Sequence, residues 1–442
     1  MKAWGTMEDL RGKKLMIIGG AFQHCKLVEA AKQLGVITYV TDYLPLESAP
    51  AKQIADYYFM NNITDIDSIV EICRKEKIDG VISTSLDACQ IPYFKVCQAL
   101  EKPCFGTEEQ FRILTDKGIF KKACIENGVD VIPEFKEADF ETTQMCEKNV
   151  DFPVLIKPSI SRGSRGQSIC NNYDEAVSAI DFAKRESANN EVIIEKYMGQ
   201  ANDFSMTILV INSKAYVIRT VDRILGKYED GLDKLAVGSA SPSVFTKLYL
   251  EKAHGKIENF IKKIGLVNAP IFMQGFVDGD CVRFYDPGLR FPGGEYERMF
   301  KHVFGKDVLY PYIEFALTGK VTEDSIQITE TDVLLNSKVA AQILPTLRAG
   351  IITEIEGLEE IRKHPNVVAV FERFKLNDEI KGTHNVNQRF AEIDIVCDSN
   401  RQVAEVSKQI FDLLKIKDEN GLDMIVSGFN PQRYLDRENY NI

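Results

Sequence analysis

The stretch Phe152-Pro153-Val154-Leu155-Ile156-Lys157-Pro158, continued by Ser159-Ile160-Ser161-Arg162-Gly163-Ser164-Arg165-Gly166-Gln167-Ser168, carries the strongest local signal in the sequence. It predicts a buried strand that ends at Lys157, followed by a flexible loop of small residues with two glycines. Such a loop can place one ammonium group and several backbone N–H groups around phosphate oxygens. Taken alone, the pattern fits a solvated hairpin loop equally well.

A second motif lies further along the chain, in Val192-Ile193-Ile194-Glu195-Lys196-Tyr197-Met198. It predicts an apolar strand whose edge offers backbone N–H and C=O groups to an adenine ring. Glu195 is placed to accept a hydrogen bond from the adenine amino group, and Asp203 could accept from ribose hydroxyls. Together, the two motifs favour a nucleotide site over a plain hairpin.

A third motif is a predicted hairpin, in which Ile271–Val277 turns through Asp278-Gly279-Asp280 into Val282–Tyr285. Gln274 and Asp286 fall at strand positions on its two arms. Their oxygen atoms could converge on one cation that lies between phosphates.

The composition is that of a globular protein of two to four domains, since the chain has 442 residues and 45% hydrophobic content. The net charge is −11, with 65 acidic against 54 basic residues. No general attraction to nucleic acid or to anionic lipid is therefore expected. An anionic ligand must be held by locally placed lysines, arginines and backbone N–H groups.

The ten cysteines are scattered without a CxxC pair and are accompanied by only five histidines. This pattern argues against a structural zinc site or a disulfide framework, and for reduced thiols in the cytoplasm. The first apolar run, Leu15–Ile18, is too short for a signal sequence, and no run approaches the length of a membrane span. We expect a soluble, cytoplasmic protein.

The first hundred residues alternate between apolar strands and amphipathic helices, which predicts a parallel sheet with helices on both faces. The Gly19-Gly20 turn lacks the third glycine of a GxGxxG loop, so a dinucleotide site is disfavoured. The predicted strands are 14–18, 36–41, 80–83 and a short one before Gly106, and the predicted helices are 26–34, 66–77 and 91–100.

After the first hundred residues, the pattern of apolar and polar residues changes. Residues 204–320 carry longer alternating strands that suit an antiparallel sheet, and the region after about residue 325 has βαβ-like content of its own. The predicted fold class is α/β and α+β. The predicted domains are a Rossmann-like domain at 1–114, a second domain at 115–325 and an α+β domain at 326–442.

Several separated motifs in this order resemble the ATP-grasp ligases, in particular the branch with biotin carboxylase, carbamoyl-phosphate synthetase large chains and bacterial amino-acid ligases. The resemblance extends to a C-terminal domain that opens with Arg348-Ala349-Gly350-Ile351-Ile352. It implies that residues 115–325 form a two-lobed ATP-grasp module with a lid lobe at about 118–200. It also implies ATP and Mg²⁺ as cofactors, with Mn²⁺ as an alternative metal.

The resemblance also implies a role for individual residues. Lys117 and Lys157 match lysines that contact phosphate, and the loop 159–168 matches a flap that closes over ATP. Asp286 matches a metal ligand, Gln274 occupies the other metal position, and Arg290 matches an arginine that stabilises the transferred phosphoryl group. Lys157 and Arg290 are the predicted catalytic residues. The predicted nucleotide-binding set is Lys117, Lys157, Ser161, Gly163, Ser164, Gly166, Glu195, Lys196, Met198 and Asp203.

Two positions depart from the family pattern, because Gln274 replaces a glutamate and Gly288 replaces an asparagine. Each departure removes an oxygen ligand or contact, for which Asp278 or Asp280 could compensate. A nucleotide binder without catalytic activity is therefore the alternative from another class.

The expected reaction is ATP-dependent ligation of a small carboxylic acid, such as an amino acid, to an amine through an acyl phosphate. The alternative enzyme acts on a phosphoribosyl amine or makes a carbamoyl phosphate; a phosphoribosyl substrate would need a basic pocket in the first domain. Within residues 14–50, the only lysines or arginines are Lys14, Lys26 and Lys32. A homodimer is a possible assembly.

Side chains that could bind substrate each have a structural alternative. Arg219, Asp222 and Arg223 could bind a carboxylate or form a surface ion-pair network. Asp42 and His24 could contact a ligand or cap a turn or helix, and for His24 capping is favoured.

Overall fold

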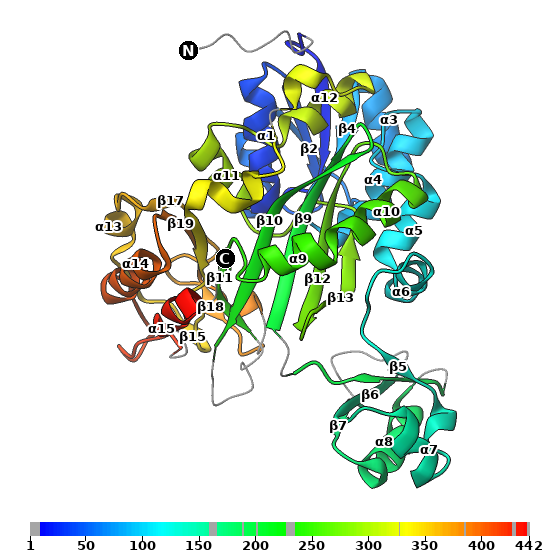
Figure 1. Ribbon diagram of the computed structural model, residues 1–442. Helices are drawn as coiled ribbons and strands as arrows, with labels where there is room; N and C mark the ends of the chain where they lie inside the picture. The colour runs from blue at the N-terminus through cyan, green and yellow to red at the C-terminus, as the bar shows by residue number, and fades with distance from the viewer. Residues whose placement is uncertain are drawn as a thin grey trace.

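The computed structural model describes residues 9–158, 166–187, 190–199, 202–226, 235–326, 328–383, 386–426 and 430–439. The chain forms three parts (Figure 1). An N-terminal α/β domain lies at the top, a large sheet runs through the middle, and a small lid lobe extends from one end. This is the mixed α/β and α+β fold class predicted from the sequence.

The N-terminal domain contains a four-stranded parallel sheet in the order β3-β2-β1-β4. Strands β1, β2 and β4 are buried, as the alternating pattern predicts, whereas the edge strand β3 is largely exposed. The short strand expected before Gly106 is wrong: residues 103–106 form a loop in which the Phe105 N–H donates to the Tyr93 hydroxyl at 3.1 Å. The elements are β1 (Lys14–Ile18), α1 (Cys25–Gln33), β2 (Ile37–Asp42), α2 (Pro50–Ile54), β3 (Tyr57–Met60), α3 (Ile66–Glu76), β4 (Gly80–Ile82) and α4 (Asp87–Leu100).

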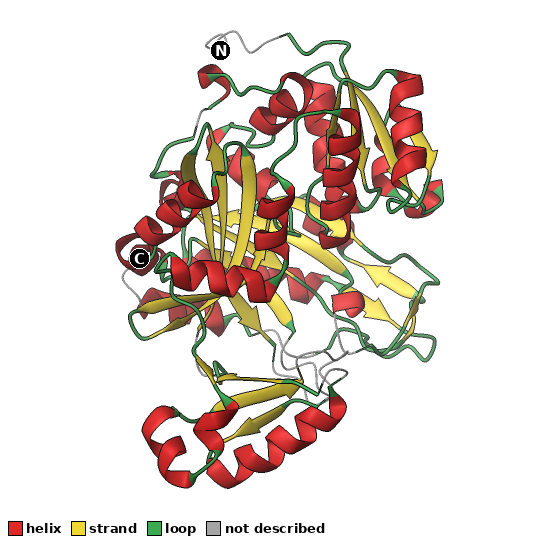
Figure 2. Ribbon diagram, turned by 90° about the vertical axis from the view of Figure 1, so that its right-hand side faces the viewer, coloured by secondary structure: helices red, strands yellow, loops and turns green. Residues whose placement is uncertain are grey.

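The lid lobe is a four-stranded antiparallel sheet in the order β5-β8-β6-β7. It has a hydrophobic core of its own, to which both of its helices contribute. Figure 2 shows the lobe set apart from the large sheet, with its helices on the outer side. Its elements are β5 (Glu134–Phe135), α7 (Thr143–Asn149), β6 (Val154–Pro158), β7 (Ser168–Cys170), α8 (Tyr173–Glu186) and β8 (Val192–Lys196).

The large sheet has eight strands in the order β13-β12-β9-β10-β11-β14-β19-β17, and every neighbouring pair is antiparallel. The predicted hairpin of residues 271–285 is present as β12 and β13. The strands are β9 (Asn202–Ile211), β10 (Lys214–Leu225), β11 (Ala236–Ser241), β12 (Ala269–Asp278), β13 (Cys281–Gly288), β14 (Val339–Ile343), β17 (Val367–Glu372) and β19 (Ala391–Cys397).

The βαβ-like content expected after residue 325 is wrong. Strands β17 and β19 pair antiparallel and extend the large sheet instead of forming a parallel unit. The residues of a strand indicate that it is buried, but they do not indicate which strand lies beside it. The sequence of this region therefore could not show whether β17 and β19 pair parallel or antiparallel. The predicted boundary at 325/326 divides this one sheet, and the domain limits stay predictions.

Helices pack against the large sheet, and two small sheets, β15–β18 and β16–β20, have two strands each. In the part of the chain that the structure describes, no helix has the length and apolar character needed to cross a membrane. The remaining elements are α5 (Glu108–Thr115), α6 (Lys117–Glu126), α9 (Thr246–Lys252), α10 (His254–Ile264), α11 (Tyr296–Phe304), α12 (Tyr310–Thr318), β15 (Gly350–Ile351), β16 (Glu354–Glu356), α13 (Leu358–Arg362), β18 (Glu379–Ile380), α14 (Asn400–Leu413), β20 (Lys415–Lys417) and α15 (Gln432–Leu435).

Candidate functional site

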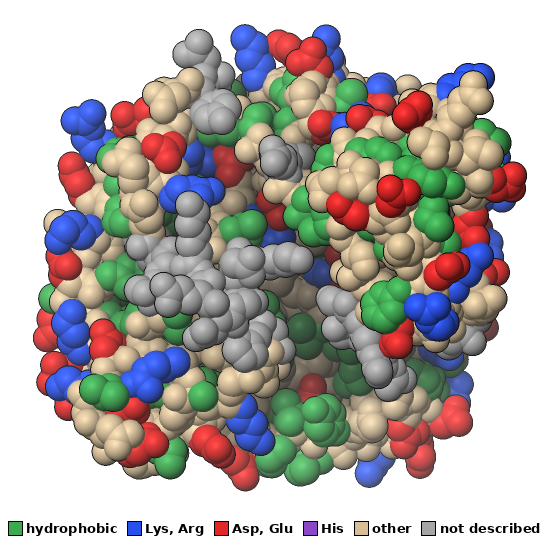
Figure 3. Space-filling model, turned by 90° about the horizontal axis from the view of Figure 1, so that it is seen from below, with side chains coloured by type: hydrophobic (Ala, Val, Ile, Leu, Met, Phe, Trp, Pro, Cys, Tyr) green, Lys and Arg blue, Asp and Glu red, His purple; other side chains and the backbone are tan. Residues whose placement is uncertain are grey.

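The two faces of the large sheet differ in chemistry. Phe204 packs against Tyr249 of α9, with ring centroids 5.7 Å apart, so alternate residues of β9 point to the helix side. The residues between them point to the opposite face, where direct cross-strand pairing aligns polar side chains. We call this the polar face. It carries Asp286, Gln274, Ser205, Thr207, Asp203, Arg223, Arg219, Ser239, Gln342 and Asp394. Seen from the lid end, the molecule is hollowed at its centre (Figure 3).

In the lid, strands β6 and β8 place Lys157 beside Glu195, because Leu155 pairs with Glu195 in the ladder and Lys157 lies one pleat further on. The Lys157 ammonium forms an ion pair with one Glu195 oxygen, and Lys121 of α6 lies 4.0 Å from the other. Glu195 thus lies between two ammonium groups and is 12% exposed. Lys121 did not stand out in the sequence, since helical position alone does not show what a lysine faces.

On the large sheet, Gln274 and Asp286 are direct cross-strand partners, and Lys117 at the start of α6 lies 3.0 Å from Asp286. The hairpin therefore brings the two predicted metal positions together. Among the described residues, no cluster of three or more His, Cys, Asp or Glu side chains could hold a metal alone. One carboxylate and one amide oxygen still fit Mg²⁺, which usually takes one or two carboxylates together with substrate phosphates and waters.

Asp278 does not lie where it could compensate for Gln274. Its carboxylate accepts from Arg283 at 2.9 Å and from Lys196 at 3.2 Å. The two cations hold the pKa of Asp278 below its usual value, against the opposing effect of burial. Asp278 instead joins lid strand β8 to the β12–β13 turn, because Lys196 is the last residue of β8.

Arg290 is held from three sides. Its Nε donates to Asp87 Oδ1 at 2.6 Å, its Nη1 donates to the Phe291 carbonyl at 2.9 Å, and its guanidinium lies 5.1 Å from the centre of the Phe272 ring. Asp87 begins α4 of the N-terminal domain, so this contact joins that domain to β13. A Cβ at Gly288 would lie 3.1 Å from Arg290 Cγ. The glycine that departs from the family pattern leaves room for the arginine.

Asp203 pairs with Arg223 at 2.8 Å across β9 and β10, while its second oxygen is buried without a partner among the described residues. Burial raises the pKa of Asp203, and Arg223 opposes the rise. A pocket of about 470 Å³ adjoins this pair. Met198, predicted to contact adenine, is buried near the end of β8. These contacts leave Asp203 able to accept one more hydrogen bond.

The flap is described only at its end. Ser161, Gly163 and Ser164 lie outside the described residues. Gly166 has φ +77°, and a Cβ there would lie 2.7 Å from Pro158 Cγ. The positive φ and the close approach both require glycine at this position, where the chain enters β7.

The structure distinguishes between the two candidate roles of Asp42, His24, Asp222 and Arg219. Asp42 accepts from the N–H groups of Gly20 and Leu44, both at 2.8 Å, which is a capping role. The capping role favoured for His24 is wrong, since its ring is buried and makes no capping hydrogen bond; burial lowers its pKa to about 4. Asp222 points to the helix side and pairs with Arg437 and Ser243. Arg219 is buried, so it belongs to no surface network.

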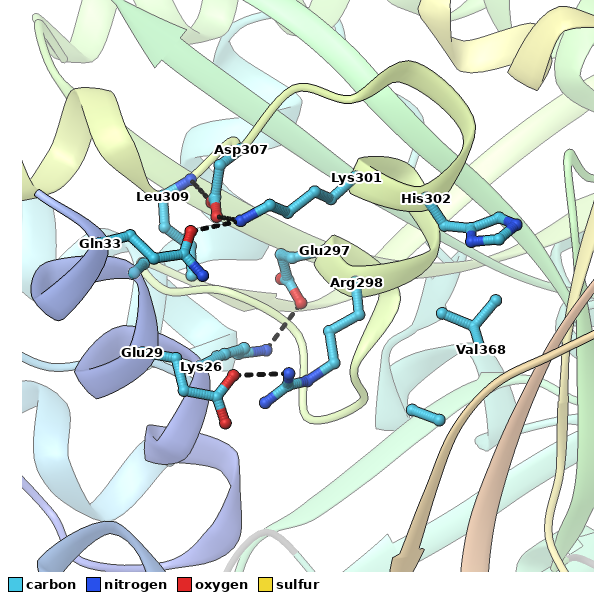
Figure 4. Close-up of a pocket in the computed structure, with 12 residues that line it drawn as sticks. Lys26, Glu29, Gln33, Glu297, Arg298, Lys301, His302, Asp307, Leu309 and Val368 are labelled. Atoms are coloured by element: carbon cyan, nitrogen blue, oxygen red, sulfur yellow. Dashed lines mark hydrogen bonds and ion pairs between the residues drawn. The ribbon is translucent and has the colours of Figure 1, made fainter. Parts of the chain in front are cut away.

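A cavity of about 350 Å³ lies between α1, α11 and β17 (Figure 4). Its charged side chains pair with one another across the domain junction. Lys26 lies 2.7 Å from Glu297, and Arg298 lies 2.6 Å from Glu29. These pairs join the N-terminal domain to the large sheet, which is a structural role.

Residues 116–223 match the family described as carbamoyl-phosphate synthase L chain, ATP binding domain. Residues 15–91 match the PylC-like N-terminal domain. The first match contains the lid lobe and strands β9 and β10. With the fold, this match identifies an ATP-grasp domain at residues 116–223.

In the aligned regions, about a quarter of the residues are identical between this chain and its curated relatives. The formate-dependent phosphoribosylglycinamide formyltransferase of Haloquadratum walsbyi is 25% identical over 46% of this chain and 50% of its own length. The carbamoyl phosphate synthase large chain of Caldanaerobacter subterraneus is 26% identical over 39% of this chain and 16% of its own length. The chain thus spans half or less of the length of these two relatives.

Solved structures share the fold over nearly the whole chain. Phosphoribosylglycinamide synthetase from Anaerococcus prevotii has a TM-score of 0.74 at 18% identity and covers 92% of this chain and 100% of its own. The L-amino acid ligase from Bacillus licheniformis has a TM-score of 0.70 at 17% identity and covers 93% of this chain and 100% of its own. These likenesses establish the architecture.

Proposed function

We propose that the protein is an ATP-dependent ligase that activates a small carboxylic acid as an acyl phosphate and joins it to an amine. The observation that carries the proposal is that Lys117, at the start of α6, lies 3.0 Å from Asp286, the cross-strand partner of Gln274 on the polar face. Lys157 on lid strand β6 supplies a second cation. Phosphoryl transfer needs positioning and charge neutralisation more than acid–base groups, and this site offers both.

In the proposed reaction, a substrate carboxylate attacks the γ-phosphorus of ATP, the bond to the β-phosphate oxygen breaks, and ADP leaves. Lys117 and Lys157 hold phosphate oxygens, and Arg290 stabilises charge on the transferred group. Bound Mg²⁺, or Mn²⁺, held by Asp286 and Gln274 would neutralise phosphate charge. An amine then displaces phosphate from the acyl carbon. Ser161, Gly163, Ser164 and Gly166 are proposed to cover the nucleotide, with Glu195, Lys196, Met198 and Asp203 at its adenosine end.

An amino acid fits better than a phosphoribosyl amine as the substrate, because the first domain has little free positive charge for a phosphate. Lys26 is committed to Glu297 at 2.7 Å, Lys32 lies 3.1 Å from Asp56, and Lys14 donates to the Glu76 carbonyl at 2.7 Å. The phosphoribosyl alternative is supported by the curated relatives that are phosphoribosylglycinamide formyltransferases, and by the fold shared with a phosphoribosylglycinamide synthetase.

The proposal is tested by measuring ATP turnover in the presence of pooled amino acids. The protein is incubated with ATP, Mg²⁺ and pooled L-amino acids, phosphate release is followed, and products are identified by mass spectrometry. Phosphate release that depends on the acids supports the ligase, and release that depends on a phosphoribosyl amine supports the alternative. ATP binding without any acid-dependent release would show a non-catalytic nucleotide binder. We also propose a cytoplasmic location and a homodimer, as one related biotin carboxylase domain is described as a dimer.

A further inference from the structure

A buried polar cluster lies at the far end of the polar face, away from Gln274 and Asp286. It consists of Arg219 on β10, Gln342 on β14, and Glu392 and Asp394 on β19. Gln342 Nε2 donates to Glu392 Oε1 at 2.6 Å and to Asp394 Oδ1 at 3.2 Å. The Glu295 N–H, just before α11, donates to Glu392 at 2.8 Å. All of these side chains are buried.

Two ionisable side chains of opposite sign in this cluster, Arg219 and Asp394, have polar atoms without a hydrogen-bond partner among the described residues. Arg219 is 6% exposed, makes no hydrogen bond or ion pair with any described residue, and lies with its guanidinium 5.0 Å from the centre of the Tyr296 ring. Asp394 is 0% exposed, and its Oδ2 has no partner among the described residues. A buried charge without a partner is costly, so the cluster is suited to a ligand that satisfies both groups.

We propose that this cluster binds a free α-amino acid, with the ligand carboxylate on Arg219 and the ligand ammonium on Asp394. The inference rests on the proposed ligase function and names its amine substrate. A phosphate or a dicarboxylate is disfavoured, because Glu392 and Asp394 would repel it. A simple amine would leave Arg219 without a partner. A zwitterion satisfies both groups and adds no net charge to the buried site.

The titration behaviour of the cluster agrees with an unfilled ion pair. Burial lowers the pKa of Arg219, and nearby Tyr296, Glu297, Glu392 and Asp394 only partly oppose this. Burial also raises the pKa of Asp394 well above its usual value, with Glu392 adding to the rise. A ligand with one positive and one negative end would stabilise the charged form of each group.

The cluster is linked to the proposed phosphate site by a short glycine loop. Arg290, which is proposed to stabilise the transferred phosphoryl group, is followed by Gly293 and Gly294. A Cβ at Gly294 would lie 2.5 Å from Gln342 Nε2, so the loop passes directly over the cluster. The polar face therefore runs from the metal position to the cluster. In the proposed reaction, the ammonium group of an amino acid bound there would first lose a proton to solvent, and the resulting amine would displace phosphate from the acyl phosphate.

The experiment measures binding by calorimetry with the full chain, with and without a non-hydrolysable ATP analogue. The probes are the standard L-amino acids, and for each amino acid that binds, its decarboxylated amine and its deaminated acid. We expect at least one amino acid to bind and both truncated probes to bind at least about tenfold more weakly, the loss typical of one charge-assisted contact.

Two variants separate the two ends of the ligand. Arg219→Gln should remove most of the preference for the amino acid over its amine, and Asp394→Asn should remove most of the preference over its acid. The matched surface controls, Arg401→Gln and Asp398→Asn, should change neither preference; Asp398 is 76% exposed.

The proposal is overturned if no amino acid binds in either nucleotide state, or if both variants weaken all three probes equally. Circular dichroism and binding of the ATP analogue verify that each variant is folded. Because binding is read without turnover, this test can fail while acid-dependent phosphate release succeeds with other amines, and the two proposals are thereby distinguished.

Discussion

Lys157 and Lys117 are the residues whose loss should affect the nucleotide most directly. Lys157→Ala and Lys117→Ala are each expected to weaken ATP binding by about 1.5–3 kcal/mol, since each removes a charge-assisted contact to phosphate. Calorimetric titration with ATP and Mg²⁺ measures the loss. Lys122→Ala, on the same helix and exposed like Lys117, is the control. Unchanged affinity in both test variants would show that the nucleotide lies elsewhere.

Gln274 tests the metal position. Gln274→Glu should tighten Mg²⁺ binding in the presence of ATP by about tenfold or more, because a carboxylate replaces a neutral oxygen beside the cation. Asp286→Asn should abolish turnover by removing the carboxylate opposite it. Asp280→Asn should not change the Mg²⁺ dependence, because Asp280 lies in the exposed turn of the hairpin, too far along the strands from the Gln274–Asp286 pair to compensate for Gln274. A Mg²⁺ titration of ATP turnover compares all four proteins, and one shared curve would refute the metal assignment.

The sequence predicted the placement of some site residues but not of others. It predicted that Gln274 and Asp286 lie together, because the turn residues between two alternating segments predict a hairpin that pairs them. Arg219 and Asp394 were not identified as one cluster, since β10 and β19 are far apart in sequence and meet only through β11 and β14. The charged residues at alternate positions in Glu392-Ile393-Asp394 were a signal, because a strand in a core rarely carries them without a reason.

At the scale of the elements, Gly166 at the end of the flap tests whether packing at this point sets the conformation of the lid lobe. Gly166→Ala should destabilise the lid and weaken ATP binding, because its φ is +77° and the new Cβ would lie 2.7 Å from Pro158 and 2.9 Å from Glu186. Gly128→Ala is the matched control: its φ is +71°, but nothing lies within 4 Å of a Cβ.

The measurement is hydrogen exchange of the β7 amides, together with ATP affinity. Both variants carry the strain of a positive φ, so only the crowding differs between them. Faster β7 exchange and weaker ATP binding in Gly166→Ala than in Gly128→Ala is the expected result. Equal behaviour would mean that packing at the flap end does not set the lid conformation.

The elements themselves followed closely from local sequence, whereas their pairing did not. Strand β1 was predicted with its observed bounds, and β2 to within one residue, because buried parallel strands are short apolar runs between turn residues. Strand β3 was missed, since an edge strand with exposed Tyr57, Tyr58 and Met60 has no buried alternation. The joining of β14, β19 and β17 to the large sheet depends on contacts between distant segments.

At the scale of the whole molecule, the junction of the N-terminal domain with the large sheet contains a buried acid that makes stability depend on pH. Burial raises the pKa of Glu295 from 4.5 to about 7, and Lys26 only partly opposes the rise. The folded state therefore binds this proton more tightly than the unfolded state does. The contribution of Glu295 to the free energy of unfolding is therefore largest at low pH and smallest above pH 7, and the two limits differ by about 3 kcal/mol.

Glu295→Gln removes this titration. Relative to the wild type, the variant should gain stability as the pH rises from about 4.5 to about 7, and the difference should then level off. Urea unfolding of both proteins at pH 5 and pH 8 measures it. The lost contact of Glu295 with Arg298, at 2.9 Å, lowers the stability of the variant at both pH values and leaves the trend. A difference that does not change with pH would contradict the burial of an ionisable Glu295.

The central claim is that the site on the polar face and lid activates a carboxylate with ATP. Trapping with hydroxylamine tests it most directly, because hydroxylamine converts an acyl phosphate into a stable hydroxamate. With ATP, Mg²⁺, pooled L-amino acids and hydroxylamine, the wild type should form hydroxamate and ADP in equal amounts, and Asp286→Asn should form neither. ADP formation without hydroxamate, or equal yields from Asp286→Asn and the wild type, would contradict the account.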